Sequence, residues 1–284
     1  MHNALFSIGP FTITLLGLFS GLGILGGLWI VHREASRHHW NEDLLFTTAL
    51  IGLVSAFLGA RLYFALIFSP AYFFSSPMRI FALHEGGLSI QGGIIGGLIG
   101  VLAYCRIKRV SFWQTADIFA PGIILGQAIG RVGCDVFGVP ASQSVWWAVP
   151  VQGQALHPVQ MYESMLNYML FLVLWRIRGK TRLNGEVFLV YIMAFAFNRF
   201  TVEFFRSNPQ AFGPFTVAHA GSIVMLAAAA SIFFLRRKHA GTAAVSAQQI
   251  SAPVGSFAGA AAAIGALATV SVGMYYLIHL VLLR

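Results

Sequence analysis

The stretch FTITLLGLFSGLGILGGLWIV, residues 11–31, runs for 21 residues without a charge. A helix needs about 20 mostly apolar residues to cross the hydrocarbon core of a bilayer. The rest of the 284-residue chain has the same character, because 57% of it is hydrophobic and only 10% is charged. Soluble domains carry about 25% charged residues. Too little polar surface remains to coat a water-soluble globule, so the sequence predicts an all-α polytopic membrane protein.

Seven further apolar stretches follow this one. We expect a membrane core of seven spans within residues 1–238, a low-complexity linker at 239–256, and one additional transmembrane helix within 257–284. The third span is rich in glycine, which lets helix backbones approach closely in membranes. The eight predicted spans are residues 11–31, 44–68, 88–105, 112–130, 161–175, 185–204, 215–235 and 257–283.

The basic residues set the expected orientation of the chain. Four loops between the predicted spans hold 12 of the 18 Lys and Arg residues, and the positive-inside rule places such loops in the cytoplasm. Both termini and the segments 69–87, 131–160 and 205–214 then face outward. The net charge of +9 is explained by topology, and we expect no nucleic-acid partner. The four basic loops are residues 32–43, 106–111, 176–184 and 236–256.

Four charges lie at membrane depth, where a charge is costly and usually marks function. Arg199 and Glu203 are spaced i, i+4, so they share a helix face and are expected to pair; a pair that only neutralises itself is the alternative. Arg61 is either functional or a structural residue that snorkels to the headgroups. Arg131 ends a span between glycines, where a guanidinium suits bidentate capture of a lipid phosphate. The alternative for Arg131 is an interface anchor.

Two further motifs carry polar residues next to predicted spans. The segment HEGGLSIQGG, residues 84–93, places Gly87, Ser89 and Gln91 at a helix start, although glycine-rich starts are common in membrane helices. The segment HPVQMYE, residues 157–163, contains a histidine and a glutamate, which we interpret as a satisfied polar pair. The sequence contains no metal-ligand cluster and no phosphate loop, so we expect no metal and no cofactor.

Taken together and in order, these motifs resemble the prolipoprotein diacylglyceryl transferase family. The resemblance extends from about Phe6 to Lys238 and leaves the last helix outside. It is carried by the segments FSIGP at 6–10, GARLY at 59–63, GGLSIQGG at 86–93, DIFAP at 117–121, GRVG at 130–133, HPVQMYE at 157–163, and Arg199 with Glu203-Phe204-Phe205-Arg206.

The resemblance implies a multi-pass enzyme of the bacterial plasma (inner) membrane with its active site near the outer leaflet. Such an enzyme moves a diacylglyceryl group from phosphatidylglycerol to the lipobox cysteine thiol of a prolipoprotein signal peptide. Glycerol phosphate is released in this first step of lipoprotein maturation. The implied partners are phosphatidylglycerol, prolipoprotein signal peptides and membrane lipids.

The resemblance also assigns candidate roles. Arg131 matches the family's phospholipid-binding arginine, and Arg199 with Glu203 match its paired residues. Gln91 stands where the best-known family pattern has a histidine proposed as base, and a neutral amide can only orient groups. The catalytic candidates are Arg199, Glu203, Gln91 and Asp135. The substrate-binding candidates are Arg131, Gly130, Gly133, Gly138, Gly87, Ser89, His157 and Arg61.

Two alternatives to an active transferase remain open. One is a paralogue of the same fold that binds lipid or signal peptide without transferring a group, which the residue at 91 favours. The other is a small transporter, although transporters typically show internal repeats and broken helices near mid-membrane. The last predicted helix follows a linker and shows no pattern of packing signals, so we expect it to be dispensable for the chemistry.

Overall fold

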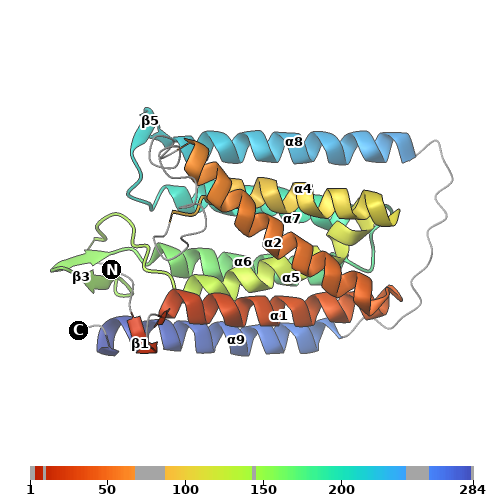
Figure 1. Ribbon diagram of the computed structural model, residues 1–284. Coiled ribbons are helices and arrows are strands. Elements are labelled where there is room, and N and C mark those ends of the chain that lie inside the picture. Colours follow the sequence, from red (N-terminus) through yellow and green to blue (C-terminus); the bar gives the residue numbers. More distant parts are fainter. Residues whose placement is uncertain (1–3, 9–10, 68–86, 143–144, 241–255, 283–284) are drawn as a thin grey trace. The chain divides into compact units, whose positions relative to one another are not determined.

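The computed structural model describes residues 4–8, 11–67, 87–142, 145–240 and 256–282, and most of these residues are helical (Figure 1). A helix lies in each of the eight predicted spans, which confirms the all-α membrane fold. The predicted outer segment at 69–87 and the linker at 239–256 lie almost entirely outside the described residues. The helices are α1 Leu15–Arg37, α2 Glu42–Ile67, α4 Ile90–Lys108, α5 Phe112–Val132, α6 Val159–Ile177, α7 Glu186–Glu203, α8 Val217–Ala240 and α9 Phe257–Leu277, with a π-helical turn at Ile278–Leu282.

Four of the described helices are long and apolar enough to cross a membrane by length and composition. They are α1, α2, α8 and the continuous helical stretch Phe257–Leu280, which contains α9. The helices α4 to α7 are shorter, and each carries polar or charged side chains that the bilayer interior would not solvate. That these four also span the membrane stays a prediction.

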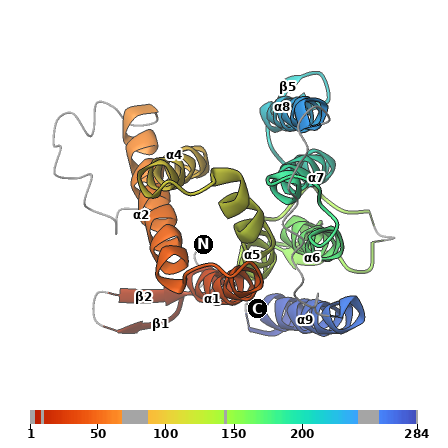
Figure 2. The same ribbon diagram turned by 90° about the vertical axis from the view of Figure 1, so that its right-hand side faces the viewer.

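The chain divides into two compact units, and the larger one comprises Met1–Glu34 and Ala116–Arg284. Within it, α8, α7, α6 and α9 form a row in that order, as Figure 2 shows. The helices α1 and α5 cross through glycines. A Cβ atom on Gly27 would lie 2.7 Å from the carbonyl oxygen of Gly122, and one on Gly126 would lie 2.8 Å from that of Gly23. Only glycine permits this backbone approach.

A partly buried carboxylate fixes α7 within this unit. The Asp117 carboxylate, on α5, accepts hydrogen bonds from the backbone nitrogens of Gly185 at 2.6 Å and Phe188 at 2.8 Å. These donors lie at the start of α7, where backbone N–H groups have no partner within the helix. Between α5 and α6, Ser164 Oγ donates to the Ala128 carbonyl oxygen at 2.8 Å. The core of the unit therefore combines apolar packing with a few satisfied polar contacts.

The second unit, Ala35–Thr115, is built on the close pair of α2 and α4. Glycines at 92, 96 and 100 recur every four residues and form one face of α4. A Cβ atom on Gly96 would overlap the carbonyl oxygen of Ser55 and lie 2.8 Å from Gly59 Cα. Small residues on both helices therefore bring the two backbones into contact, as in other membrane helix pairs.

Three short antiparallel hairpins connect or precede helices of the larger unit, at the left end of Figure 1. The sequence did not predict them, and they shorten two of the predicted spans. The first helix begins at Leu15 and not at residue 11, because the alternating β-branched segment Phe11–Thr14 pairs as a strand. The strands are β1 Ala4–Ile8 with β2 Phe11–Thr14, β3 Val149–Val151 with β4 Gln154–Leu156, and β5 Gln210–Phe212 with β6 Phe215–Thr216.

Candidate active site

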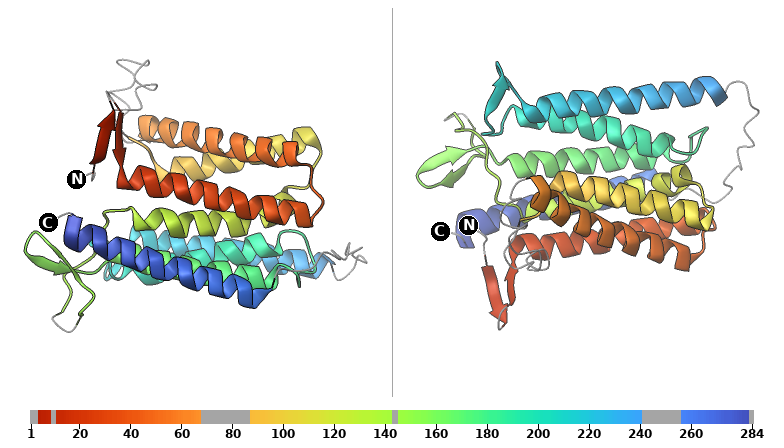
Figure 3. Two further views of the ribbon diagram at one scale, coloured as in Figure 1. Left: turned by 90° about the horizontal axis from the view of Figure 1, so that it is seen from below. Right: turned by 45° about the horizontal axis from the view of Figure 1, so that its top comes forward.

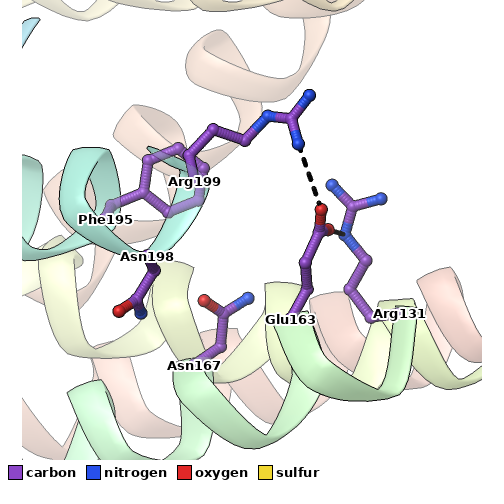
Figure 4. Close-up of a pocket in the computed structure, with 6 residues that line it drawn as sticks. All are labelled: Arg131, Glu163, Asn167, Phe195, Asn198 and Arg199. Carbon is purple, nitrogen blue, oxygen red and sulfur yellow. Dashed lines mark hydrogen bonds and ion pairs between the residues drawn. The ribbon is translucent and has the colours of Figure 1, made fainter. Parts of the chain in front are cut away.

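Three arginines converge on one buried carboxylate, that of Glu163. Arg131 Nε, at the end of α5, lies 2.7 Å from Glu163 Oε2. Arg199 Nη1, near the end of α7, lies 3.4 Å from Oε1, and Arg206 Nη1, just beyond α7, lies 3.1 Å from the same oxygen. Glu163 is in the second turn of α6, so three helix ends meet at this point. Figure 4 shows Arg131 and Arg199 reaching Glu163 from two different helices.

A second carboxylate holds Arg199 from its other side. Arg199 Nη2 lies 2.8 Å from Glu203 Oε2, which confirms the ion pair predicted from the i, i+4 spacing. Glu203 Oε1 accepts hydrogen bonds from Asn208 Nδ2 at 2.7 Å and Thr216 Oγ1 at 2.6 Å. The Glu203 side chain is 0% exposed, so its carboxylate is enclosed by these partners. Its geometry suits holding Arg199 in place and not contact with a substrate.

The cluster carries excess positive charge. Three guanidinium groups and two carboxylates give a formal charge of +1. The most accessible members are Arg131 and Arg199, whose side chains are 27% and 23% exposed. Arg131 contacts Glu163 through Nε, which leaves its terminal nitrogens outside that ion pair. An arginine presented in this way suits a bidentate contact with a phosphate or another anion.

A small pocket opens beside the cluster, as Figure 4 shows. One side is charged and the other combines amides with an aromatic ring. The ring is that of Phe195. One turn earlier, the Tyr191 hydroxyl accepts a hydrogen bond from Gln127 Nε2 at 3.1 Å. The lining residues are Arg131, Glu163, Asn167, Phe195, Asn198 and Arg199.

The glycines around Arg131 allow close packing of the backbone that carries it. A Cβ atom on Gly133 would lie 2.5 Å from the carbonyl oxygen of Leu15, and one on Gly138 would overlap that of Phe205. Gly130 is less confined, with its nearest contact at 3.9 Å. These three glycines were predicted to admit substrate, and their contacts give them a structural reason to be glycine.

The loop after Arg131 contacts the end of α5 and the helical segment that follows α9. The Cys134 backbone nitrogen donates to the Arg131 carbonyl oxygen at 3.2 Å. Burial raises the pKa of the Cys134 thiol, although the charge of Arg131 acts in the opposite direction. The next residue, Asp135, contacts His279 Nε2 through Oδ1 at 3.2 Å. His279 lies beyond α9, so the additional helix reaches a predicted site residue.

His157 and Glu163 do not form the polar pair that we expected. His157 Nδ1 lies 2.9 Å from the Tyr162 hydroxyl, which also accepts a hydrogen bond from Trp147 Nε1 at 2.7 Å. The interpretation was wrong because His157 precedes α6, whereas Glu163 lies on the helix and faces the ends of α5 and α7. His157 therefore orders the segment that leads into α6.

Four site candidates belong to the second unit and form local contacts there. Arg61 is buried, and its Nη1 donates to the Gly87 carbonyl oxygen at 3.1 Å. Gly87 has a φ of +77°, a conformation that favours glycine. Ser89 caps α4, and its hydroxyl donates to Gln91 Oε1 at 2.8 Å. The exposed Gln91 side chain is thus oriented by the cap of its own helix.

The list of site candidates drawn from the sequence omitted four members of the cluster: Glu163, Arg206, Asn208 and Thr216. Glu163 is a lone carboxylate just inside a predicted span, where charges are costly, and Arg206 belongs to one of the segments that carry the resemblance. The partners of Glu163 come from α5 and α7, so only tertiary packing shows that it is the centre of the cluster.

Comparison with known proteins gives one family. The model of the prolipoprotein diacylglyceryl transferase family matches residues 3–235. A phosphatidylglycerol–prolipoprotein diacylglyceryl transferase of Bacillus cereus (strain G9842) is 33% identical over 245 residues, which cover 81% of this chain and 90% of that protein. Proteins of the same name from Bacillus thuringiensis subsp. konkukian (strain 97-27) and Bacillus anthracis (strain CDC 684) are 33% and 32% identical over the same coverage.

Proposed function

We infer, from the premise that this chain belongs to the prolipoprotein diacylglyceryl transferase family, that it transfers the diacylglyceryl group of phosphatidylglycerol to prolipoproteins. The protein is a membrane-embedded transferase of lipoprotein biosynthesis. The observation that carries the site assignment is the convergence of Arg131, Arg199 and Arg206 on Glu163. A lipid phosphate is the anionic part of the donor, and this cluster supplies excess positive charge to hold it.

The acceptor in this proposal is the thiol of a lipobox cysteine. In the diacylglyceryl group, one glycerol carbon is bonded through oxygen to the phosphate. The sulfur of the thiol attacks this carbon. A C–S bond forms, the C–O bond to phosphate breaks, and glycerol phosphate leaves with the electron pair. A free thiol has a pKa of about 8.5 and reacts as thiolate. The positive field of the arginines favours the thiolate, so we propose that its proton passes to water.

In this proposal the arginines contact the donor and the glutamates position the arginines. Arg131 and Arg199 contact the phosphate, and they stabilise the charge that builds on it as the C–O bond breaks. Glu163 holds both guanidinium groups at the pocket, and Glu203 with its two hydrogen-bond donors fixes the far side of Arg199. We assign Glu203 a positioning role, because its carboxylate is enclosed.

We place the site near the outer leaflet of the bacterial plasma membrane. Support comes from the two ends of α6. Glu163 lies near its start, whereas the basic loop at 176–184 begins at its end. If that loop is cytoplasmic, as its charges indicate, the arginine cluster lies toward the opposite face. There it meets both the headgroup of the donor and a cysteine presented by a signal peptide.

The test is a transfer assay with purified protein in lipid nanodiscs. Nanodiscs containing phosphatidylglycerol are incubated with a lipobox peptide, and the peptide mass is followed for addition of a diacylglyceryl group. Phosphatidylethanolamine nanodiscs and a peptide with serine in place of the cysteine are the controls. We expect addition only with phosphatidylglycerol and the cysteine peptide. Binding of both substrates without any mass change would identify the non-transferring paralogue instead.

A further inference from the structure

We propose that α9 is a working part of this transferase, and that His279 is a positioning residue which holds Asp135 and the loop after Arg131. The inference rests on the proposed function of the arginine cluster. It concerns residues beyond 235, where the match to the family model ends. The segment was expected to be a dispensable addition, and its contacts argue otherwise.

A polar seam joins α9 to α6, which run side by side (Figure 3). Gln160 Nε2 donates to the Tyr275 hydroxyl at 2.7 Å, and the Tyr168 hydroxyl lies 2.8 Å from Ser271 Oγ. All four side chains are buried. Without α9, the polar groups of Gln160 and Tyr168 would face lipid, where an unsatisfied group costs several kcal/mol. The seam shows that α6 is built to be covered by α9.

The seam follows the helical repeat on both sides. On α6, Gln160 and Tyr168 are eight residues apart, and on the C-terminal segment Ser271, Tyr275 and His279 follow one another at intervals of four residues. Residues i, i+4 and i+8 lie along one face of a helix. The third polar residue of the C-terminal stripe, His279, therefore lies beyond the end of the seam, on the side of the loop that follows α5.

Both ring nitrogens of His279 are engaged. Nε2 lies 3.2 Å from Asp135 Oδ1, and Nδ1 lies 2.9 Å from the Tyr275 carbonyl oxygen. The ring also packs against Tyr275, with centroids 4.2 Å apart, and against Phe137 at 5.6 Å. The His279 side chain is only 4% exposed. The ring is therefore fixed on several sides, and it is a rigid partner for Asp135.

The same region of the C-terminal segment packs against the two elements that hold the arginine cluster. Tyr275 and Ile278 share a buried apolar core with Val132, next to Arg131, and with Met161, two residues before Glu163. Loss of the contact at Asp135 would loosen the turn through Cys134, whose backbone nitrogen donates to the Arg131 carbonyl oxygen at 3.2 Å. A small displacement of a positioned group is enough to slow catalysis substantially.

The first test measures how accessible Cys134 is in the loop after Arg131, and it does not depend on transfer activity. Full-length protein in nanodiscs is treated with a maleimide, and the rate of labelling at Cys134 is followed by mass spectrometry. We expect about fivefold faster labelling in His279→Ala, since one partly buried contact is lost. His279→Gln should stay near the wild-type rate, because an amide nitrogen can still donate to Asp135. His239→Ala is the matched control, on an exposed histidine of α8.

The second test measures transfer. We expect His279→Ala to remain folded and to lose about tenfold in kcat/KM for phosphatidylglycerol, mainly through KM, with most of the loss restored in His279→Gln. Asp135→Ala should cause the same loss, and the double variant should lose no more than either single variant. If His279→Ala fails to fold, Asp135→Ala tests the same contact from the other side.

The two proposals fail in distinguishable ways. A wild-type protein without transfer activity would overturn the proposed function, yet the labelling rates would still report on His279. Unchanged labelling and unchanged kcat/KM in His279→Ala would overturn the positioning role, and so would a loss that His279→Gln does not restore. Additive losses in the double variant would show that His279 does not act through Asp135, which also overturns it.

Discussion

At the scale of single residues, the strongest prediction concerns Arg131. Lysine keeps the charge but loses the planar fork, so it cannot replace arginine at a bidentate phosphate contact. We expect Arg131→Ala to reduce kcat/KM by about 10²-fold or more, because it removes charge stabilisation in the transition state, and Arg131→Lys to recover only a small part. Arg106→Lys, on an exposed arginine of α4, is the control. Near-normal turnover in Arg131→Ala would reduce Arg131 to an interface anchor.

Gln91 tests whether a base at this position is indispensable. Its amide accepts a hydrogen bond from Ser89 and is exposed, so it is oriented by the cap of α4 and able to bond a ligand. We expect Gln91→Ala to lower transfer by about three- to tenfold, the effect of one lost hydrogen bond. The wild-type protein should turn over without a histidine at position 91. Transfer by the three proteins is compared across pH 5 to 8. An inactive wild-type protein together with an active Gln91→His variant would contradict this account.

The ion pairs show which part of the site can be predicted from sequence. The pair of Arg199 and Glu203 follows from their spacing on one helix, because residues i and i+4 are neighbours whatever surrounds them. The contacts of Glu163 depend on three helix ends that meet only after packing. The sequence alone therefore predicts the pair, whereas the centre of the cluster requires the structure.

At the scale of elements, the pair of α2 and α4 gives a prediction with a built-in control. A Cβ atom on Gly96 would overlap the Ser55 carbonyl oxygen, whereas one on Gly93 would lie 3.5 Å from its nearest neighbour. We expect Gly96→Ala to destabilise the protein by about 1–3 kcal/mol through overpacking, and Gly93→Ala to leave it nearly unchanged. Thermal unfolding in detergent measures both. Equal midpoints for the two variants would contradict the close packing.

Hydropathy located a helix in every predicted span, but it could not give the helix ends. The strand at Phe11–Thr14 has the same apolar character as the helix that follows, and only its β-branched alternation distinguishes it. The last helix was expected to lack packing signals, although Ser271, Tyr275 and His279 are spaced four residues apart. Three polar residues among many apolar ones gain meaning only when α6 offers a matching stripe.

At the scale of the whole molecule, the two ends of α6 carry two different groups of basic residues. The arginine cluster lies at the start of α6 and the basic loop lies after its end. In the proposed topology, the charged residues that orient the protein are separated along one helix from those proposed to bind the donor. The net charge of +9 then divides between arginines assigned to the cytoplasmic face and arginines assigned to the donor lipid.

The last prediction tests that orientation directly. Single cysteines are introduced at Ser142, in the segment between α5 and α6, and at Thr181, in the basic loop, after both native cysteines have been replaced. A membrane-impermeant maleimide added to intact cells should label the probe at Ser142 and spare the one at Thr181, because the positive-inside rule retains the basic loop in the cytoplasm. Both probes should react once the membrane is permeabilised, which shows that each cysteine is accessible. Labelling of Thr181 alone in intact cells would invert the topology, and it would move the arginine cluster to the face from which no exported signal peptide could present its cysteine.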